Sequence, residues 1–126
     1  MAFEATYLGS NGWLIKFQKS NLIIDPWLKG DLIFPPGEWF FKGSLEKEIL
    51  IDKKIDIVLL TQGLPDHCHV PTLEMFRKDI PIICPKSAVE TLKKIGFNAI
   101  KILKPTEKIN LFNLSFRSEE HTSELQ

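Results

Sequence analysis

A short apolar run in the middle of the chain sets the strongest limit on how it can fold. The residues from Asp56 to Thr61 are mainly β-branched and aliphatic and are followed by Gly63 and Pro65, which is typical of a buried strand that ends in a loop. Pro71 then suits the first turn of a helix. The apolar side of this helix is predicted to carry Leu73, Met75 and Phe76. This order predicts a sheet with helices packed against it.

A second strand and helix follow this first unit. Ile80 to Cys84 is predicted to be a strand, and the next helix is expected to begin with a capping box formed by Ser87 and Glu90. Gly96 is expected to end that helix. Its apolar side carries Ala88, Leu92 and Ile95. Two more strands are predicted, at Ala99 to Leu103 and at Lys108 to Phe116.

The N-terminal part of the chain has a different pattern. Three short β-rich runs are separated by turn residues and predict an antiparallel meander, with strands at Phe3 to Leu8, Gly12 to Phe17 and Asn21 to Asp25. The segment from Trp27 to about Leu50 is predicted to be irregular. A meander followed by β-α units places the fold in the mixed α/β or α+β class.

An aromatic cluster lies within the irregular segment. Trp39, Phe40 and Phe41 are consecutive and follow a Pro-Pro-Gly turn. One interpretation makes them a lip over a substrate site, and the other packs them against the edge of the sheet. We favour packing, because large aromatic side chains usually bury themselves.

The composition is that of an ordinary globular domain. The chain has 126 residues, 44% of them hydrophobic, and its 16 basic residues balance 16 acidic ones. This balance gives no indication of a nucleic-acid partner. No apolar run approaches the ~20 residues that cross a bilayer, and the first residues do not resemble a secretory signal. Two cysteines, Cys68 and Cys84, are too few for a disulfide framework, so we expect a cytoplasmic protein with no membrane partner.

The loop after the central strand holds the residues that are most capable of chemistry. Asp66, His67 and His69 lie within four positions of one another. Carboxylate and imidazole are ligands that zinc accepts. A loop at the end of a strand can turn such side chains toward one point. We therefore predict that these three residues cluster at the end of the strand that closes at Thr61, with Asp66 as the catalytic candidate and all three as metal-ligand candidates.

The strand, the loop and the preceding Leu-Ile-Ile-Asp-Pro segment together resemble the metallo-β-lactamase superfamily, whose signature is His-x-His-x-Asp-His after a buried strand. Asp66 and His67 match the last two positions of the signature, whereas Gln62 and Leu64 occupy the first two. A divergent branch of the superfamily with Gln-x-Leu-x-Asp-His-Cys-His is also similar. The resemblance implies the N-terminal half of a four-layer αββα sandwich.

The resemblance also implies what the departures cost. In the family, the first two histidines hold one metal ion, and the aspartate and the last histidine hold a second. Leu64 offers no ligand atom, so the first site is lost. One weak zinc site is expected to survive, built from Asp66, His67 and His69. By the same resemblance, Asp25 is a candidate carboxylate for orienting the metal loop, and the alternative is a simple Asp-Pro turn.

Each candidate has a structural alternative. Asp66 is also suited to capping the helix near Pro71. His69 is of a type that more often makes structural hydrogen bonds than binds metal. Cys68, between two histidines, raises the alternative of a thiol enzyme, but a small buried residue is the interpretation we favour.

The last ten residues lack hydrophobic periodicity. Residues 117–126 resemble the in-frame translation of a common sequencing-library adapter. We therefore expect a partial domain over residues 1–116 and a non-native polar tail over residues 117–126, with the rest of the fold cut away. His121, which lies in this tail, is left out of the functional interpretation.

These expectations combine into one functional hypothesis. The chain is expected to be a metal-dependent hydrolase of the metallo-β-lactamase fold, acting on a small-molecule substrate of unknown identity and inactive in truncated form. The alternative is a non-catalytic binding or scaffolding protein on the same fold. Strands that carry Ile57, Ile82, Ile100 and Leu111 toward an absent second sheet are expected to leave an apolar face exposed and to promote self-association.

Overall fold

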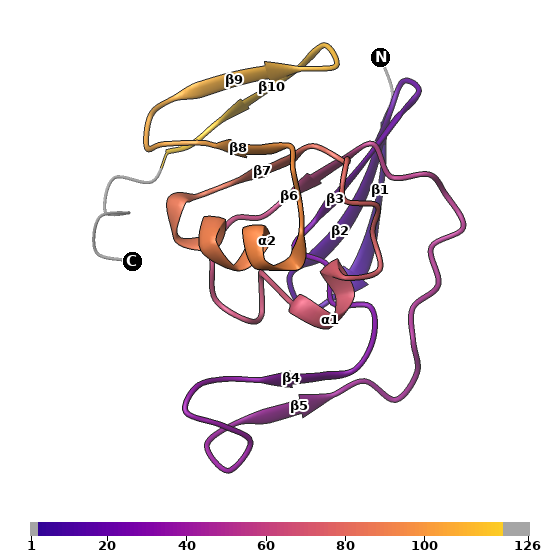
Figure 1. The fold of residues 1–126 in the computed structure, drawn as a ribbon. Helices are drawn as coiled ribbons and strands as arrows, with labels where there is room; N and C mark the ends of the chain where they lie inside the picture. The colour runs from indigo at the N-terminus through magenta and orange to yellow at the C-terminus, as the bar shows by residue number, and fades with distance from the viewer. Residues whose placement is uncertain (1–2, 120–126) are drawn as a thin grey trace.

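A single mixed sheet organises the molecule. The computed structural model describes residues 3–119. The first three strands, β1 (Phe3–Gly9), β2 (Gly12–Phe17) and β3 (Ser20–Ile24), form the predicted antiparallel meander. Three further strands, β6 (Ile57–Leu59), β7 (Ile82–Cys84) and β8 (Ile100–Ile102), extend the sheet in parallel from β3. The order β1-β2-β3-β6-β7-β8 therefore changes from antiparallel to parallel at β3, as Figure 1 shows.

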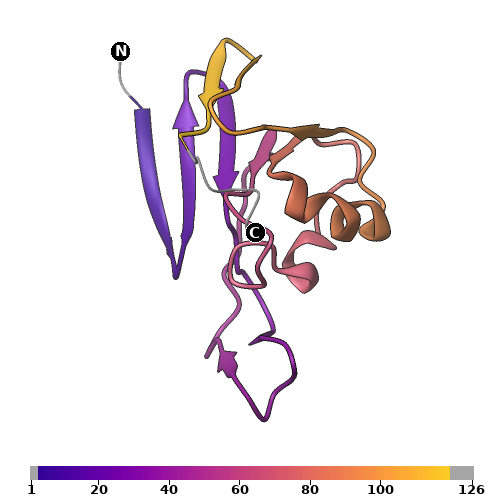
Figure 2. The ribbon, with the colours of Figure 1, turned by 90° about the vertical axis from the view of Figure 1, so that its left-hand side faces the viewer.

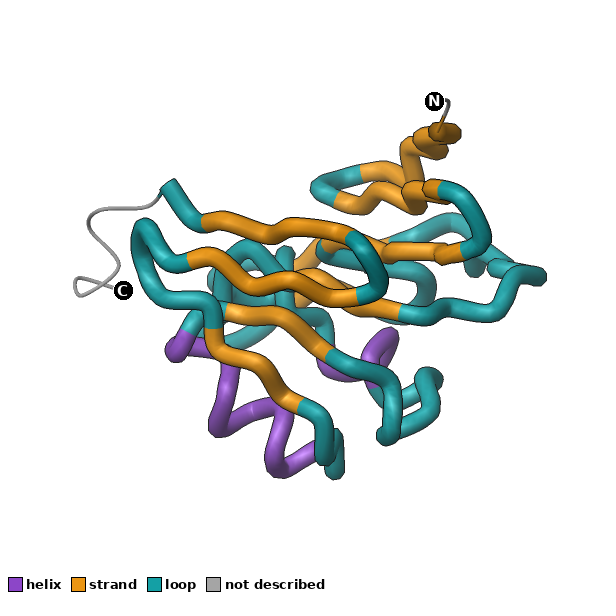
Figure 3. Tube along the Cα trace, turned by 90° about the horizontal axis from the view of Figure 1, so that it is seen from above, coloured by secondary structure: helices purple, strands orange, loops and turns teal. Residues whose placement is uncertain are grey.

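The helices cover one face of this sheet. They are α1 (Val70–Leu73), the 3₁₀ turn η1 (Lys86–Ala88) and α2 (Val89–Ile95). Each lies in a crossover between parallel strands, and Figure 3 shows them gathered on one side of the sheet. The core beneath them includes Ile23, Val58 and Leu92, whose exposed fractions are all 0%. This burial of aliphatic side chains is the main stabilising term of the fold.

A hairpin covers part of the other face. Its strands are β9 (Lys108–Leu111) and β10 (Leu114–Arg117), and Figure 2 shows it on the side of the sheet away from the helices. Phe116 packs with Leu22, Ile57 and Ile83 in a second apolar cluster. Ile57 is therefore fully buried rather than exposed, because the chain's own last strands supply a partner for it.

This hairpin corrects the prediction of one strand from Lys108 to Phe116. The chain reverses at Phe112 and Asn113, whose φ angles are 52° and 63°. Two consecutive positive φ angles are the mark of a tight type I′ hairpin turn, in which asparagine is tolerated. The strand also continues to Arg117, one residue beyond the predicted domain boundary. The rest of the predicted tail, residues 120–126, lies outside the described residues.

The helical segments are shorter than predicted. Helix α1 has one turn and ends at Leu73, so the predicted apolar positions at Met75 and Phe76 lie beyond it. The capping-box prediction is wrong, because Ser87 lies inside η1 and the α2 N-cap has no side-chain hydrogen bond. Gly96 does end α2, with a φ of 113° that favours glycine.

The predicted irregular segment contains a small hairpin. Strands β4 (Asp31–Ile33) and β5 (Lys42–Ser44) pair with each other and project from the sheet, as seen in Figure 1. Trp39 and Phe40 lie between them and are 82% and 63% exposed, so the prediction that the aromatic cluster packs on the sheet edge is wrong for these two residues. No helix of the described residues is long and apolar enough to cross a membrane.

Candidate metal site

The site begins where two neighbouring parallel strands end. Asp25 follows β3, and its backbone N–H donates to the Leu59 carbonyl of β6 at 3.0 Å. Thr61 follows β6 by two residues. The parallel pairing of these strands therefore brings two residues that lie far apart in sequence to one edge of the sheet. Asp25 adopts a φ of 44°, a left-handed conformation that aspartate tolerates better than most residues do.

The Asp25 carboxylate is the centre of the hydrogen-bond network. It is 3% exposed. Oδ1 accepts the Thr61 backbone N–H at 2.8 Å, and Oδ2 accepts the Thr61 hydroxyl at 2.5 Å. Oδ2 also lies 2.8 Å from Nδ1 of His67. The structure thus places Asp25 as the resemblance implied, in contact with the metal loop rather than as a simple turn residue.

This network fixes the orientation of the His67 ring. Asp25 is an acceptor, so the proton of the neutral imidazole is assigned to Nδ1. Nε2 is then left with its lone pair and faces Oδ2 of Asp66 at 3.5 Å. Two acceptor atoms are stable at this separation only with a positive charge on the ring or a cation between them.

Asp66 is held in place from the first hairpin. The Asn11 side-chain amide lies 3.2 Å from both Oδ2 and the backbone carbonyl of Asp66. Its other carboxylate oxygen, Oδ1, is buried and has no hydrogen-bond partner among the described residues. Asp66 does not cap α1, whose N-cap position is His69. An unpartnered buried carboxylate oxygen beside a histidine nitrogen is suited to binding a cation.

The donor set fits only part of a catalytic zinc centre. Within residues 3–119 no group of three or more His, Cys, Asp or Glu side chains is arranged to hold a metal ion. Catalytic zinc takes about three protein ligands and a water. Asp66 and His67 supply two, and Leu64, which is 53% exposed at the neighbouring position of the loop, supplies none. We therefore derive no catalytic step through a bound metal.

Gly63 keeps the metal loop close to the next crossover. A Cβ atom at this position would lie 2.8 Å from the backbone carbonyl oxygen and from Oγ of Ser87. Contacts of that length are not tolerated, so only glycine lets the loop pass η1 at this distance. The loop between Thr61 and Asp66 is thus fixed by packing as well as by hydrogen bonds.

The structure does not bring His69 to the other two candidates. The ring is 3% exposed, with Nδ1 2.8 Å from Oγ1 of Thr72 and Nε2 2.8 Å from the Asp31 carbonyl. Both nitrogens are therefore engaged within the protein. The Leu28 backbone N–H donates to the same Thr72 hydroxyl at 2.9 Å. His69 thus joins the metal loop to the start of the β4–β5 hairpin, and burial lowers its pKa.

Cys68 is buried, as we favoured. Burial, together with the negative charge of Asp25, raises the pKa of its thiol to about 11. A thiol with this pKa is protonated at neutral pH and is a poor nucleophile. The thiol-enzyme alternative therefore has no support at this site.

Sequence reasoning missed Asn11 and Thr61. Asn11 lies in a turn between β1 and β2, and its type is as common in turns as in sites. Thr61 was recognised only as the end of a strand. Both contact the candidate residues through pairings that join distant parts of the chain, so no local pattern marks them.

Comparison with known proteins identifies the fold. Residues 4–123 match the family described as "Beta-lactamase superfamily domain". No curated protein matches the sequence significantly. A possible metal-dependent hydrolase from Veillonella parvula has a similar structure, with a TM-score of 0.68 and 17% identity over 90% of this chain and 46% of that one.

Two further structures show the range of chemistry on this fold. An isothiocyanate hydrolase from Delia radicum gut bacteria gives a TM-score of 0.61 at 19% identity, over 86% of this chain and 43% of its own. CmlA, a diiron beta-hydroxylase from Streptomyces venezuelae, gives 0.58 at 17% identity, over 84% and 21%. This chain thus spans less than half of each solved structure. The matched residues and the shared fold together show that the chain belongs to the beta-lactamase superfamily domain family and has the N-terminal half of a metallo-β-lactamase fold.

Proposed function

We propose that this protein is a metal-dependent hydrolase whose described part supplies two ligands, Asp66 and His67, to one divalent cation. The observation that carries the proposal is the pair of acceptors at 3.5 Å, His67 Nε2 and Asp66 Oδ2, held there by Asp25 and Asn11. Holding two acceptors together has a free-energy cost that a bound cation removes. A histidine that donates its other ring N–H to a carboxylate is the usual arrangement of a metal ligand.

Zinc is the cation that we propose. Imidazole nitrogen and carboxylate oxygen form a borderline donor set that suits zinc, and iron is the alternative that such ligands also accept. The solved structures that resemble this chain include a possible metal-dependent hydrolase and a diiron enzyme, which supports the use of a metal on this fold. The matched part covers less than half of those chains, and we propose that further ligands come from the remainder of such a fold.

The residues of this chain have distinct proposed roles. A metal at this position would acidify a bound water and polarise a substrate oxygen. Asp25 holds His67 in the Nδ1–H tautomer, and Asn11 aligns the Asp66 carboxylate. Asp66 is the residue that we assign to the reaction itself, because its Oδ1 has no partner among residues 3–119. The two buried thiols are compatible with a reducing, cytoplasmic location.

A non-catalytic binding protein is the second candidate. Its support is Leu64, an exposed apolar side chain at a position where the family has a metal ligand. Loss of that ligand does not harm a binding or scaffolding role. A panel of ester, amide and phosphodiester substrates separates the two, since only the hydrolase predicts turnover once the cation and its remaining ligands are present. With two ligands, the 126-residue chain alone is expected to bind zinc weakly and to show no turnover.

A zinc titration with a competing chromophoric chelator tests the site. Wild-type protein is expected to bind one zinc ion weakly, and His67→Ala and Asp66→Ala are expected to lose this binding. His121→Ala is the matched control, because it removes the histidine of the predicted tail. Equal affinity of the wild type and His67→Ala would refute the proposal. Tight binding by the wild type would show that the two-ligand description is wrong.

A further inference from the structure

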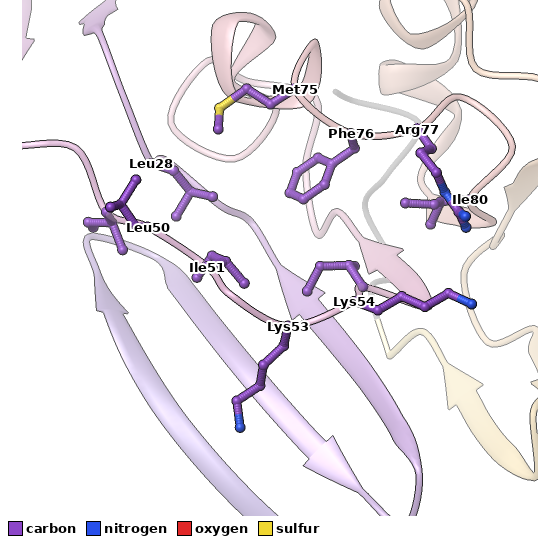
Figure 4. A pocket seen from close by; sticks show the side chains of 11 residues that line it. Leu28, Leu50, Ile51, Lys53, Lys54, Met75, Phe76, Arg77 and Ile80 are labelled. Carbon is purple, nitrogen blue, oxygen red and sulfur yellow. The ribbon is translucent and has the colours of Figure 1, made fainter.

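A separate cavity lies away from the metal loop. Its volume is about 360 Å³, and it is formed by the segment that precedes β6 and the segment that follows α1, as Figure 4 shows. None of the residues of the candidate metal site lines it. Its volume lies at the lower end of the range of small-molecule pockets, ~300–1,000 Å³. The cavity is therefore of a size for one short ligand.

The floor of the cavity is apolar. Leu28, Ile55 and Ile80 are 1%, 6% and 4% exposed and belong to the core beneath the helices. Ile51 and Phe76 are partly buried and pack against the same core. Figure 4 shows the side chains of Leu28, Ile51 and Phe76 around a common space. These surfaces favour the aliphatic part of a ligand, at about 25 cal/mol per Å² of apolar area buried.

The rim of the cavity is positively charged. Its lining includes Lys53, Lys54 and Arg77 and contains no carboxylate. Neither lysine forms an ion pair within the described residues. Arg77 contacts Asp79 at 3.3 Å, but both side chains are more than 60% exposed, so this pair is weak. An anion near the rim would therefore meet cations that nothing else in the described chain neutralises.

The cations differ in direction. Figure 4 shows Lys54 extending toward the end of the cavity where Arg77 and Ile80 lie, whereas Lys53 points away from it. We propose that this cavity binds a medium-chain aliphatic carboxylate of about eight carbons, with its chain on the apolar floor and its carboxylate at the Lys54 and Arg77 end. This site is independent of the metal loop and of the proposed hydrolase activity.

A methyl NMR experiment on the full chain tests the proposal directly. The protein has two methionines, and Met75 lines the cavity, so methyl-¹³C methionine labelling gives a local probe that Met75→Leu identifies. Octanoate is expected to shift the Met75 signal in a saturable way. Octyltrimethylammonium and octanol are expected to bind about ten-fold more weakly, because they lack the anionic head. Equal binding of the three probes, or no shift of Met75, overturns the proposal.

Two charge-reversal variants add a matched comparison. Lys54→Glu is expected to weaken octanoate binding about ten-fold, because it places a negative charge beside the carboxylate. Lys53→Glu has the same change of net charge on the neighbouring residue but points away, and its effect is expected to stay within about two-fold owing to solvent screening. Thermal melts confirm that both variants fold. Equal loss in the two variants would show that only net charge matters, and would overturn the proposal.

Discussion

His67 and Asp25, 42 residues apart in the chain, meet with His67 Nδ1 2.8 Å from Asp25 Oδ2. This contact joins the end of the meander to the loop after the first parallel strand. It settles which nitrogen of His67 faces Asp66. The same carboxylate also holds Thr61, so the edge of the sheet and the metal loop depend on one buried side chain.

Asp25→Ala is expected to destabilise the fold by about 2–4 kcal/mol, because three donors lose a buried charged acceptor. Urea unfolding measures this change. Asp79→Ala, at an exposed aspartate, is the control and is expected to cost less than about 0.5 kcal/mol. If the two variants unfold at the same midpoint, the Asp25 network does not stabilise the molecule.

Zinc is expected to be retained at well below one equivalent after purification, and chelation is expected to leave the melting temperature almost unchanged. Both follow from a site with two protein ligands, since weak binding contributes little linkage stabilisation. Metal analysis and thermal melts with and without EDTA provide the measurement. A large fall in melting temperature on chelation would show that zinc is a structural element of the fold.

His69→Ala is expected to destabilise the protein by about 2–3 kcal/mol, because it leaves the Thr72 hydroxyl and the Asp31 carbonyl without their buried partner. Hydrogen exchange is expected to rise selectively in the β4–β5 hairpin, which this ring attaches to the loop. His121→Ala should leave both readouts unchanged. Loss of zinc binding in a folded His69→Ala variant would instead indicate that His69 is a ligand.

Neither cysteine is expected to react with iodoacetamide in the native protein at pH 7 to 8. Burial raises the pKa of Cys68 to about 11 and that of Cys84 to about 12, so the reactive thiolate is scarce at this pH. Mass spectrometry with and without urea measures the labelling. Rapid native labelling of Cys68 would restore the thiol-enzyme alternative.

Two truncations separate the tail from the last strand. Deleting residues 120–126 is expected to leave the urea midpoint unchanged, because Leu125 is the only large aliphatic residue in that segment. Deleting residues 117–126 is expected to cost about 1 kcal/mol, because the backbone hydrogen bonds of Ser118 with Thr106 and Glu107 are lost. Equal midpoints for both variants would show that β10 contributes nothing beyond Phe116.

Self-association of the full chain stays a prediction, now with a different surface. Phe3 and Tyr7 of the edge strand β1 are 62% and 57% exposed. An open edge strand with exposed aromatic residues is prone to pair with another copy. Tyr7→Lys is expected to reduce association in light scattering, whereas Lys101→Gln on β8 is expected not to. A monodisperse wild-type monomer at high concentration would contradict this prediction.

The sequence by itself determined the parts of the molecule that depend on local pattern. Alternation and turn residues marked the meander, the run from Asp56 to Thr61 marked the central strand, and Gly96 marked the end of α2. The resemblance placed Asp66 and His67 in one loop. The hairpin turn at Phe112 and Asn113 was missed because its signal, an asparagine without a glycine, is weak.

Only the tertiary structure decided which side chains meet. The parallel pairing of β3 with β6 brought Asp25 to Thr61 and His67, and the first hairpin supplied Asn11. His69 has the same ligand chemistry as His67 and lies two residues away, yet it is held by Thr72 and Asp31 on the other side of the loop. A ligand is defined by direction and by burial, and both depend on residues that are far away in the chain and close only in the fold.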